Sequence, residues 1–399
     1  MISETSDIVT REKSSSARLN RRSYGKFLPA LLFLFFFLIQ SSFAQTGPGG
    51  VGNNVSNRLW LKADGNVYRD AGVTPAADGD QVQQWNDNSG NNNFASQPLV
   101  VNRPVYRAAV VNGANTFPAI QFTGNTFIDP GALGILGTQG FSILTVVKVN
   151  PGYNPGAMND GTGDFIMDRS LVTNELTSLK LANVNRFGFQ KRDNGGGGLG
   201  GPVSTSAINT ANFTVIDYMR ELPRAFYRLF INGTNESSVA DGDGNLTPPI
   251  PRIGRHSNTV NGGLKGYISE LIIYNYRINN AQVNIINSYL AAKYDLTILG
   301  NRYGYRSTHK YDVAGIGRED ASNFHNNATS AGILNISSPS SLDNNDYLLY
   351  GHDNGSVAGW VATEAPTDIQ NICGGFCGDP SCNGSIIMAV QQVIVIVET

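Results

Sequence analysis

The sequence predicts an all-β protein, a two-sheet jelly-roll sandwich with one short capping helix at its C-terminal end and a partial second β-region after it. Three observations predict this fold class. Short runs of β-branched, aromatic and aliphatic residues recur along the chain. The segments between them are rich in asparagine and glycine, and glycine alone supplies 45 of the 399 residues. One segment has the apolar periodicity of a helix. Many short strands separated by turns are typical of a sandwich or jelly roll.

The N-terminal segment has the pattern of a secretory signal. A basic flank from Arg18 to Lys26 precedes the apolar run Leu28–Ile39, which is shorter than the roughly 20 residues of a membrane span. Small residues at Ser42 and Ala44 predict cleavage before Gln45. An uncleaved N-terminal anchor is the alternative. We therefore expect a secreted protein, extracellular or at the cell surface, with no transmembrane span once the signal is removed.

Eight segments of the following region are expected to be strands. They are Arg58–Ala63, Gln81–Asn86, Ala119–Thr123, Phe141–Val149, Arg186–Gln190, Phe213–Met219, Tyr227–Ile231 and Tyr267–Tyr274. The fourth carries apolar residues on both faces, which predicts a central strand buried on both sides. Trp60 and Trp85 are expected in the core. The turn-rich segment Asp87–Asn93 follows the second strand.

The helix is predicted to begin at Asn279, a suitable N-cap residue, with Gln282 three residues later in a weak capping-box pattern. Lys293 falls in its last turn, where positive charge suits the helix dipole. Apolar residues recur at helical spacing and give the helix one apolar face. These residues are Val283, Ile286, Leu290 and Tyr294. We expect this helix to cover one end of the sandwich.

The chain after Gly300 is expected to be a smaller β-region. Tyr311–Arg318 and Asp346–Asn354 alternate strand and turn residues. The apolar stretch Ser385–Val397 is β-prone and predicts either an edge strand or a truncated or frameshifted product. The predicted organisation is therefore a signal at 1–44, a first domain at 45–300, a partial second β-domain at 301–365 and an atypical cysteine-containing apolar tail at 366–399.

Charge and cysteine usage exclude some classes of function. Charged residues make up 15% of the chain and the net charge is −2, so no basic surface for nucleic acid is expected. The only cysteines, Cys373, Cys377 and Cys382, do not have a common zinc spacing. In an exported protein this spacing favours one local disulfide and a free thiol over a metal site.

Five motifs in order resemble a known family. They are LWLKAD at Leu59–Asp64, WNDNSGNN at Trp85–Asn92, PAIQFTG at Pro118–Gly124, LFING at Leu229–Gly233 and GYISELIIYN at Gly266–Asn275. Together they resemble the LamG-like, concanavalin A-like lectin/glucanase jelly rolls of secreted surface proteins from gliding-type bacteria. The phrase SYLAAKYDLTI at Ser288–Ile298 is similar to the closing helix of such domains, and the resemblance covers Gly47 to Gly300. The strands after residue 310 resemble the start of the domain that commonly follows, and the sequence departs from that pattern after Trp360.

The resemblance includes glucanases, which use a pair of carboxylates across the scissile bond. The strand motif E-x-D-x-E of related retaining glucanases is absent. Glu270 lies between same-face isoleucines and is interpreted as a paired structural residue, and Asp217 is interpreted in the same way. No histidine lies in a G-x-S-x-G or H-E-x-x-H context. We therefore predict a protein that is not an enzyme, with a hydrolase whose carboxylates converge from separate strands as the alternative.

Candidate binding residues are few. Asp241, Asp243 and Asn245 place oxygen ligands at every second position, as calcium loops do, although a solvated hairpin turn is the favoured interpretation. Asp87 with Asn88 is a weaker candidate for a calcium site. Four aromatic residues in loops are weak candidates for stacking on a sugar, with packing as the favoured role. They are Tyr153, Tyr303, Tyr305 and Trp360. The sequence thus predicts a secreted, adhesin-like protein that binds glycan or another surface ligand, with a structural spacer as a further alternative.

Overall fold

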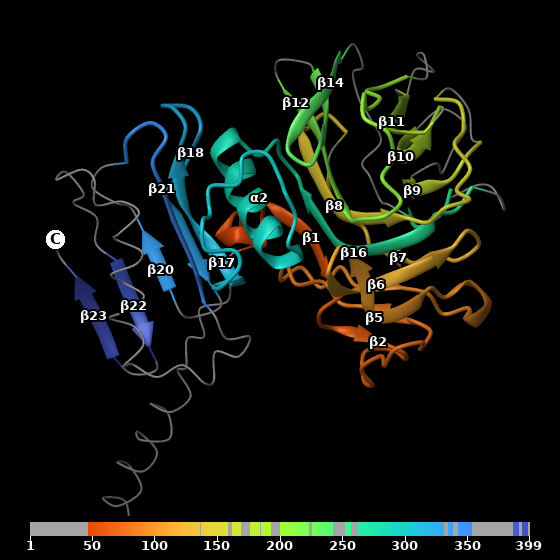
Figure 1. Ribbon diagram of the computed structural model, residues 1–399, viewed down its shortest axis with the longest axis horizontal. Helices are drawn as coiled ribbons and strands as arrows, with labels where there is room; N and C mark the ends of the chain where they lie inside the picture. The colour runs from red at the N-terminus through yellow and green to blue at the C-terminus, as the bar shows by residue number, and fades with distance from the viewer. Residues whose placement is uncertain are drawn as a thin grey trace, which may run out of the picture. The chain divides into compact units, whose positions relative to one another are not determined.

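The structure is a computed structural model and is described here from residue 47 to 352 and in two further strands (Figure 1). Within the first range, the description leaves out residues 136, 159–161, 169–175, 184, 193–199, 223–225, 242–251, 257–261, 331–333 and 338–341. The further strands span residues 386–390 and 393–397. The predicted signal, the three cysteines and Trp360 lie outside the described residues. No helix in the described ranges is long and apolar enough to cross a membrane.

One large antiparallel sheet forms the first layer, with strand order β14-β13-β12-β8-β16-β6-β5. Its strands are β5 (Val105–Asn112), β6 (Asn115–Thr123), β8 (Phe141–Val149), β12 (Thr214–Glu221), β13 (Phe226–Ile231), β14 (Thr234–Ala240) and β16 (Lys265–Tyr274). The first half of β16 pairs with β6, and its second half pairs with β1 (Asn57–Lys62). The change of partner coincides with a bulge at Ser269, between Ile268 and Glu270.

Two smaller sheets form the second layer. One has the order β11-β10-β9-β15 and the other β2-β3-β4-β7. Their strands are β2 (Val67–Tyr68), β3 (Gln84–Trp85), β4 (Ala95–Ser96), β7 (Asp129–Pro130), β9 (Phe165–Asp168), β10 (Leu176–Ala182), β11 (Arg186–Arg192) and β15 (Arg252–Ile253). A bridge between Ile128 and Ile253 joins them. A cluster of buried side chains from both layers, including Phe122, Phe141 and Phe187, forms the sandwich core. The predicted all-β sandwich is confirmed.

Strand β8 matches its predicted bounds and is buried on both faces, as expected. Phe141, Ile143 and Val147 belong to the sandwich core. Leu144 and Val146 point the other way, into a second cluster that includes the helix. Trp85 is buried in the sandwich core and Trp60 in the second cluster, so both tryptophans are core residues as predicted.

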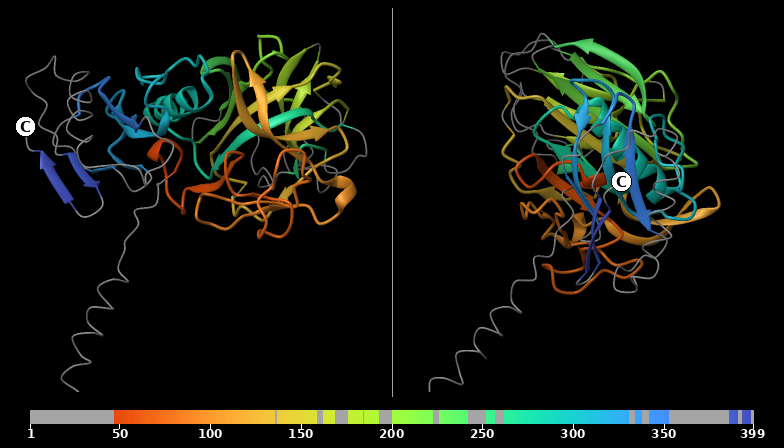
Figure 2. Two further views of the ribbon diagram at one scale, coloured as in Figure 1. Left: turned by 60° about the horizontal axis from the view of Figure 1, so that its bottom comes forward. Right: turned by 90° about the vertical axis from the view of Figure 1, so that its left-hand side faces the viewer.

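Helix α2 (Asn280–Tyr294) begins as predicted. The Asn279 side chain accepts from the Gln282 backbone N–H at 3.0 Å, and the Gln282 side chain accepts from the Asn279 N–H at 2.9 Å. The expectation of a single apolar face is wrong, because α2 is buried on nearly all sides. Figures 1 and 2 show the reason: the helix lies between the large sheet and a further group of strands, and its second cluster includes Val313 of β17 (Tyr311–Arg318).

The strands after residue 310 form two sheets, β18-β17-β21 and β19-β20-β22-β23. Their remaining bounds are β18 (Phe324–His325), β19 (Asn327–Ser330), β20 (Leu334–Ser337), β21 (Tyr347–His352), β22 (Ile386–Val390) and β23 (Val393–Val397). The Glu319 carboxylate accepts from Asn284 of α2 and from Arg302, which ties this region to the helix. A His325 ring nitrogen lies 3.1 Å from the Gly50 carbonyl of the short helix η1 (Pro48–Gly50). Residues on the two sides of the predicted boundary at 300 therefore share one hydrophobic cluster.

Candidate functional site

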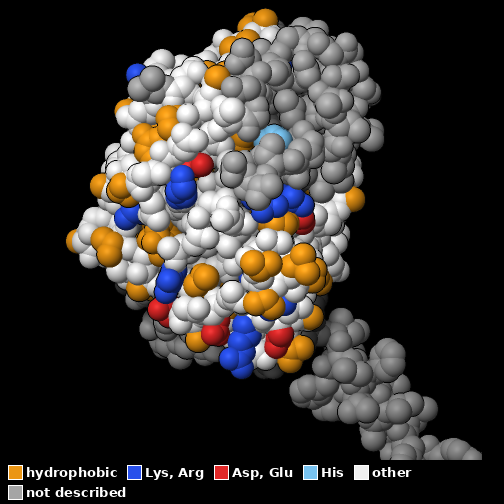
Figure 3. All heavy atoms as spheres, turned by 90° about the vertical axis from the view of Figure 1, so that its right-hand side faces the viewer, with side chains coloured by type: hydrophobic (Ala, Val, Ile, Leu, Met, Phe, Trp, Pro, Cys, Tyr) orange, Lys and Arg blue, Asp and Glu red, His pale blue; other side chains and the backbone are white. Residues whose placement is uncertain are grey.

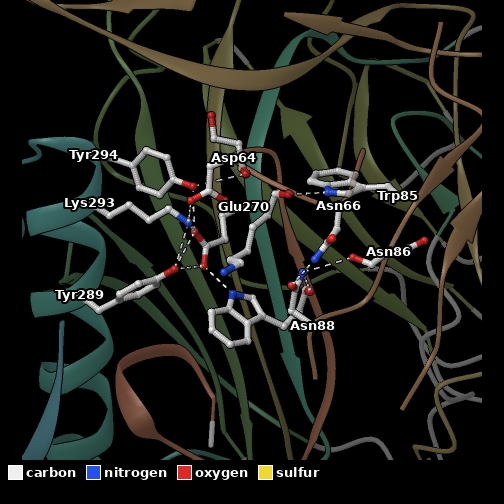
Figure 4. A network of polar contacts seen from close by, with 12 residues as sticks. Asp64, Asn66, Trp85, Asn86, Asn88, Glu270, Tyr289, Lys293 and Tyr294 are labelled. Atoms are coloured by element: carbon white, nitrogen blue, oxygen red, sulfur yellow. Dashed lines mark hydrogen bonds and ion pairs between the residues drawn. The ribbon is translucent and has the colours of Figure 1, made fainter. Parts of the chain in front are cut away.

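Glu270 is the centre of a buried polar network (Figure 4). Its carboxylate accepts hydrogen bonds from Trp60 Nε1 at 2.7 Å, the Tyr289 hydroxyl at 2.9 Å, the Tyr294 hydroxyl at 2.8 Å and Lys293 Nζ at 2.8 Å. The donors come from β1 and α2, whereas Glu270 lies on β16. The network therefore fastens the helix to the sheet, and Glu270 is the paired residue that its isoleucine neighbours predicted.

The surroundings of the network raise the pKa of its lysine and of its two tyrosines. Burial opposes the charged form of Lys293, but Asp64, 3.0 Å from its Nζ, and Glu270 outweigh that effect and raise the lysine pKa. Burial, together with the Glu270 charge, raises the pKa of both Tyr289 and Tyr294 well above its ordinary value. Both phenols thus keep their protons and donate them in hydrogen bonds. The arrangement favours a structural role over proton transfer.

The Asp87 carboxylate organises the turn that follows β3. One of its oxygens accepts from the backbone N–H groups of Trp60 and Ser89, both at 2.9 Å. The other accepts from the Ser89 hydroxyl at 2.7 Å and the Asn93 N–H at 3.1 Å. Asn91 and Asn93 also donate their side-chain amides to backbone carbonyls at the start of β1. These residues hold the turn against β1, and a cation at Asp87 would have to displace donors already in place.

Asp217 on β12 corrects an expectation from the sequence. It is fully buried, and neither carboxylate oxygen has a hydrogen-bond partner. The interpretation of Asp217 as a paired residue is therefore wrong. Its neighbours on the same face, Val215 and Met219, belong to the apolar cluster around α2. Burial raises the pKa of Asp217 to about 7, because ionisation would leave an uncompensated charge in an apolar layer.

The predicted aromatic candidates are dispersed. Tyr153 is half-buried against the sandwich core and donates to Asn185. Tyr303 is buried in the cluster around α2, and its hydroxyl donates to the His309 carbonyl at 2.7 Å. Tyr305 is 46% exposed and meets the Tyr303 ring edge-on at 6.3 Å. Among the three described candidates, Tyr305 has the ring most open to a ligand.

The predicted calcium ligands are described only in part. Asp241 is buried and accepts from Arg220 Nε at 2.7 Å, so this carboxylate already has a cationic partner. Asp243 and Asn245 lie outside the described residues. In the described part of the chain, no group of three His, Cys, Asp or Glu side chains is placed to hold a metal ion. A calcium site at 241–245 stays a prediction.

A surface cluster that the sequence did not reveal lies where the two small sheets meet. We call Phe127, Asp129, Arg252 and Arg255 the arginine–phenyl cluster. Backbone N–H···O bonds of 3.0 Å in both directions between Ile128 and Ile253 bring its two segments together. The guanidinium carbon of Arg252 is 4.0 Å from the centroid of the Phe127 ring, and that of Arg255 is 4.2 Å from it. Contacts of this kind stabilise a cation by about 0.5–1 kcal/mol at exposed sites.

The backbone of β15 explains how this cluster is presented. Gly254 follows β15 with a φ of +93°, and a Cβ added there would lie 2.1 Å from the Phe122 ring. Only glycine fits this backbone without strain and this close approach to the core. The chain can therefore pack against Phe122 and still carry an arginine on each side of the glycine to the surface.

The two arginines have different partners. Arg252 makes a bidentate pair with Asp129, with both N···O distances at 3.0 Å. Arg255 donates from Nη1 to the Asn125 carbonyl at 3.2 Å, its Nε has no partner, and no described carboxylate pairs with it. Burial and then the Arg252 charge lower the pKa of Arg255, while Asp129 opposes them. Figure 3 shows the side of the molecule on which β7 and β9 lie, where basic side chains are spread among hydrophobic and acidic ones.

A buried layer lies behind the cluster. Asp168 pairs in register with Arg252 across β9 and β15 and lies 3.8 Å from the His256 ring. His256 meets the Phe165 ring edge-on at 4.7 Å, and Lys180 Nζ lies 4.8 Å from the same ring. Burial lowers the pKa of His256 in spite of Asp168, so the ring is neutral at pH 7. This buried layer lies beneath the surface cluster and supports it.

No family model and no curated protein matches the chain. Solved structures with a similar arrangement include domain 4 of AbnA, an extracellular GH43 arabinanase from Geobacillus stearothermophilus, in complex with arabinotriose. That match has a TM-score of 0.40 and 15% sequence identity, and it covers 58% of this chain and 98% of the other. The CBM40 of Ruminococcus gnavus IT-sialidase bound to α2,3-sialyllactose matches at 0.35 and 16% identity over 42% and 94%. The binding domain of botulinum neurotoxin serotype D matches at 0.39 and 14% over 75% and 69%. With TM-scores below 0.5, these structures carry no argument about ligand or family, and the LamG-like assignment stays a prediction.

Proposed function

We propose that this chain is a secreted, non-enzymatic protein that binds glycan or another surface ligand, and that the arginine–phenyl cluster contacts that ligand. The observation that carries the proposal is the contact of two guanidinium groups with one phenyl ring, because it holds several N–H donors in place at the surface. Such donors suit sugar hydroxyl and acidic groups. The sandwich beneath them holds the donors in place before a ligand arrives, which lowers the entropy cost of binding.

The positions of the acids favour binding over hydrolysis. A glycosidase needs two carboxylates about 5 to 10 Å apart on either side of the scissile bond. The two acids that the sequence placed on strands of the first domain, Glu270 and Asp217, are both fully buried. Glu270 is engaged by four donors, and Asp217 lies in an apolar layer. Neither is placed to reach a polysaccharide.

Calcium at Asp241, Asp243 and Asn245 remains a separate proposal, supported by the alternating oxygen ligands in the sequence. Chelation tests it. If the site holds calcium, EDTA lowers the melting temperature and added calcium restores it, because a bound ion stabilises the folded state by mass action. An unchanged melting temperature would reject the calcium proposal without affecting the proposed binding function.

The test of the proposed function is a binding screen of the mature chain from Gln45 against a broad polysaccharide panel with calcium present. Release of reducing sugar is measured in the same samples. We expect saturable binding to at least one glycan class and no product. Product release that requires the protein would support the hydrolase alternative. Absence of binding to every polysaccharide would favour the structural spacer.

A further inference from the structure

The arginine–phenyl cluster has more positive than negative charge among its own members. Two guanidinium groups share the Phe127 ring, and Asp129 is the one carboxylate paired with either of them in the described structure. Asp129 engages Arg252 through both of its oxygens. Arg255 is left beside a like charge without a carboxylate, which is unfavourable unless an anion compensates it.

The geometry of Arg255 suits an external acidic group. The contact with Phe127 holds its guanidinium group in place, and within the described residues it makes one hydrogen bond, to the carbonyl of the exposed Asn125. Its Nε is buried without a partner, so an external ligand would meet the terminal amino groups of the guanidinium and not Nε. Charge-assisted bonds from these groups to a carboxylate or sulfate are stronger than bonds to a neutral hydroxyl.

The described charged groups near the cluster do not pair with Arg255 in place of an external acidic group. Lys265 and Asp164 pair with each other at 3.4 Å. Behind the cluster, Asp168 lies against the neutral His256 and in register with Arg252, not with Arg255. The positive charge at Arg255 thus lies at the surface, next to the paired Arg252 and Asp129.

We propose that the arginine–phenyl cluster selects an acidic saccharide, one that carries carboxylate or sulfate groups, and that Arg255 holds the acidic group. The inference rests on the proposed function and names the class of ligand for the same site. Sugar acids and sulfated sugars offer the same chemistry to a guanidinium group, so the experiment separates them with different polymers.

The experiment measures binding of the mature chain to polygalacturonate, dextran sulfate and neutral dextran at two salt concentrations. Arg255→Gln removes the unpaired cation, and Asp129→Asn removes the carboxylate that offsets Arg252. Arg69→Gln is the matched control, since Arg69 is exposed and its nearest carboxylate is 4.0 Å away. We expect one or both acidic polymers to bind, dextran to bind at least tenfold more weakly, and salt to weaken binding.

The two cluster variants are expected to change the affinity for the acidic polymer in opposite directions. Arg255→Gln weakens binding of the acidic polymer about tenfold or more, Asp129→Asn tightens it, and Arg69→Gln leaves it unchanged. The melting temperature of each variant is measured alongside, and the tightening in Asp129→Asn cannot arise from loss of folding. Binding to polygalacturonate alone identifies a carboxylate ligand, and binding to dextran sulfate alone identifies a sulfated one; both support the inference.

Two results would overturn it. Equal binding to dextran and to the acidic polymers, unaffected by either cluster variant, would reject an acidic ligand and leave the proposed glycan binding intact. Binding to none of these polymers or of the broader panel would reject the proposed function as well.

Discussion

Asp217 gives a quantitative prediction about stability. Its carboxyl is fully buried without a hydrogen-bond partner, and burial raises its pKa from the ordinary 3.8 to about 7. The native state therefore keeps this proton up to about pH 7, whereas the unfolded chain loses it near pH 4. Between these values the native state binds more protons, so the free energy of unfolding falls as the pH rises and levels off above pH 7. The pKa difference corresponds to roughly 4 kcal/mol.

Urea denaturation followed by tryptophan fluorescence measures this effect. The substitution Asp217→Asn keeps the shape and removes the titration, so the difference between variant and wild type isolates Asp217 from all other carboxylates. We expect the free energy of unfolding of the variant, minus that of the wild type, to be roughly 4 kcal/mol larger at pH 8 than at pH 4. Asp78→Asn is the control, because the Asp78 side chain is 60% exposed. Parallel stability curves for Asp217→Asn and wild type from pH 4 to pH 8 would refute the reasoning.

Three further substitutions test the packing and the polar contacts by urea denaturation. Tyr289→Phe removes a donor from the buried Glu270 carboxylate and is expected to lower the free energy of unfolding by about 1–3 kcal/mol. The control Tyr305→Phe, on an exposed ring, is expected to change it by less than about 0.5 kcal/mol. Equal effects of the two substitutions would contradict the structural role of the network. Asp87→Ala removes four hydrogen bonds to a carboxylate and is expected to cost about 3 kcal/mol or more, so a neutral outcome would contradict its role in the turn. Gly254→Ala places a Cβ against Phe122 at a positive φ and is expected to cost at least about 2 kcal/mol; unchanged stability would show that the backbone adjusts.

The strands that position the core were predictable because their residues show a local pattern. β8 matches its predicted bounds, β17 lies in a segment that was predicted to alternate strand and turn residues, and the capping box of α2 was evident from Asn279 and Gln282. Strands with mixed composition were missed, including β9 and β14, since they lack a strong local pattern. The burial of α2 on nearly all sides was missed because β17 packs against it from beyond residue 310.

The candidate site was less predictable than the fold. Glu270 could be interpreted correctly from its isoleucine neighbours, but the same argument failed for Asp217, because a sequence does not show whether a buried acid has a donor nearby. The arginine–phenyl cluster joins Phe127 to Arg252 and Arg255 across more than 120 positions of sequence. The arginines alone, in the phrase RIGR at 252–255, carry no signal for a binding site.

The most direct test of the proposed site is hydrogen–deuterium exchange of the mature chain with and without a saturating acidic polysaccharide. The account predicts slower exchange in residues 125–129 and 252–255, the two segments that carry the arginine–phenyl cluster, and little change around Tyr303 and Tyr305. Slower exchange around Tyr305, with 125–129 and 252–255 unaffected, would contradict the account and place the binding surface among the aromatic residues after residue 300.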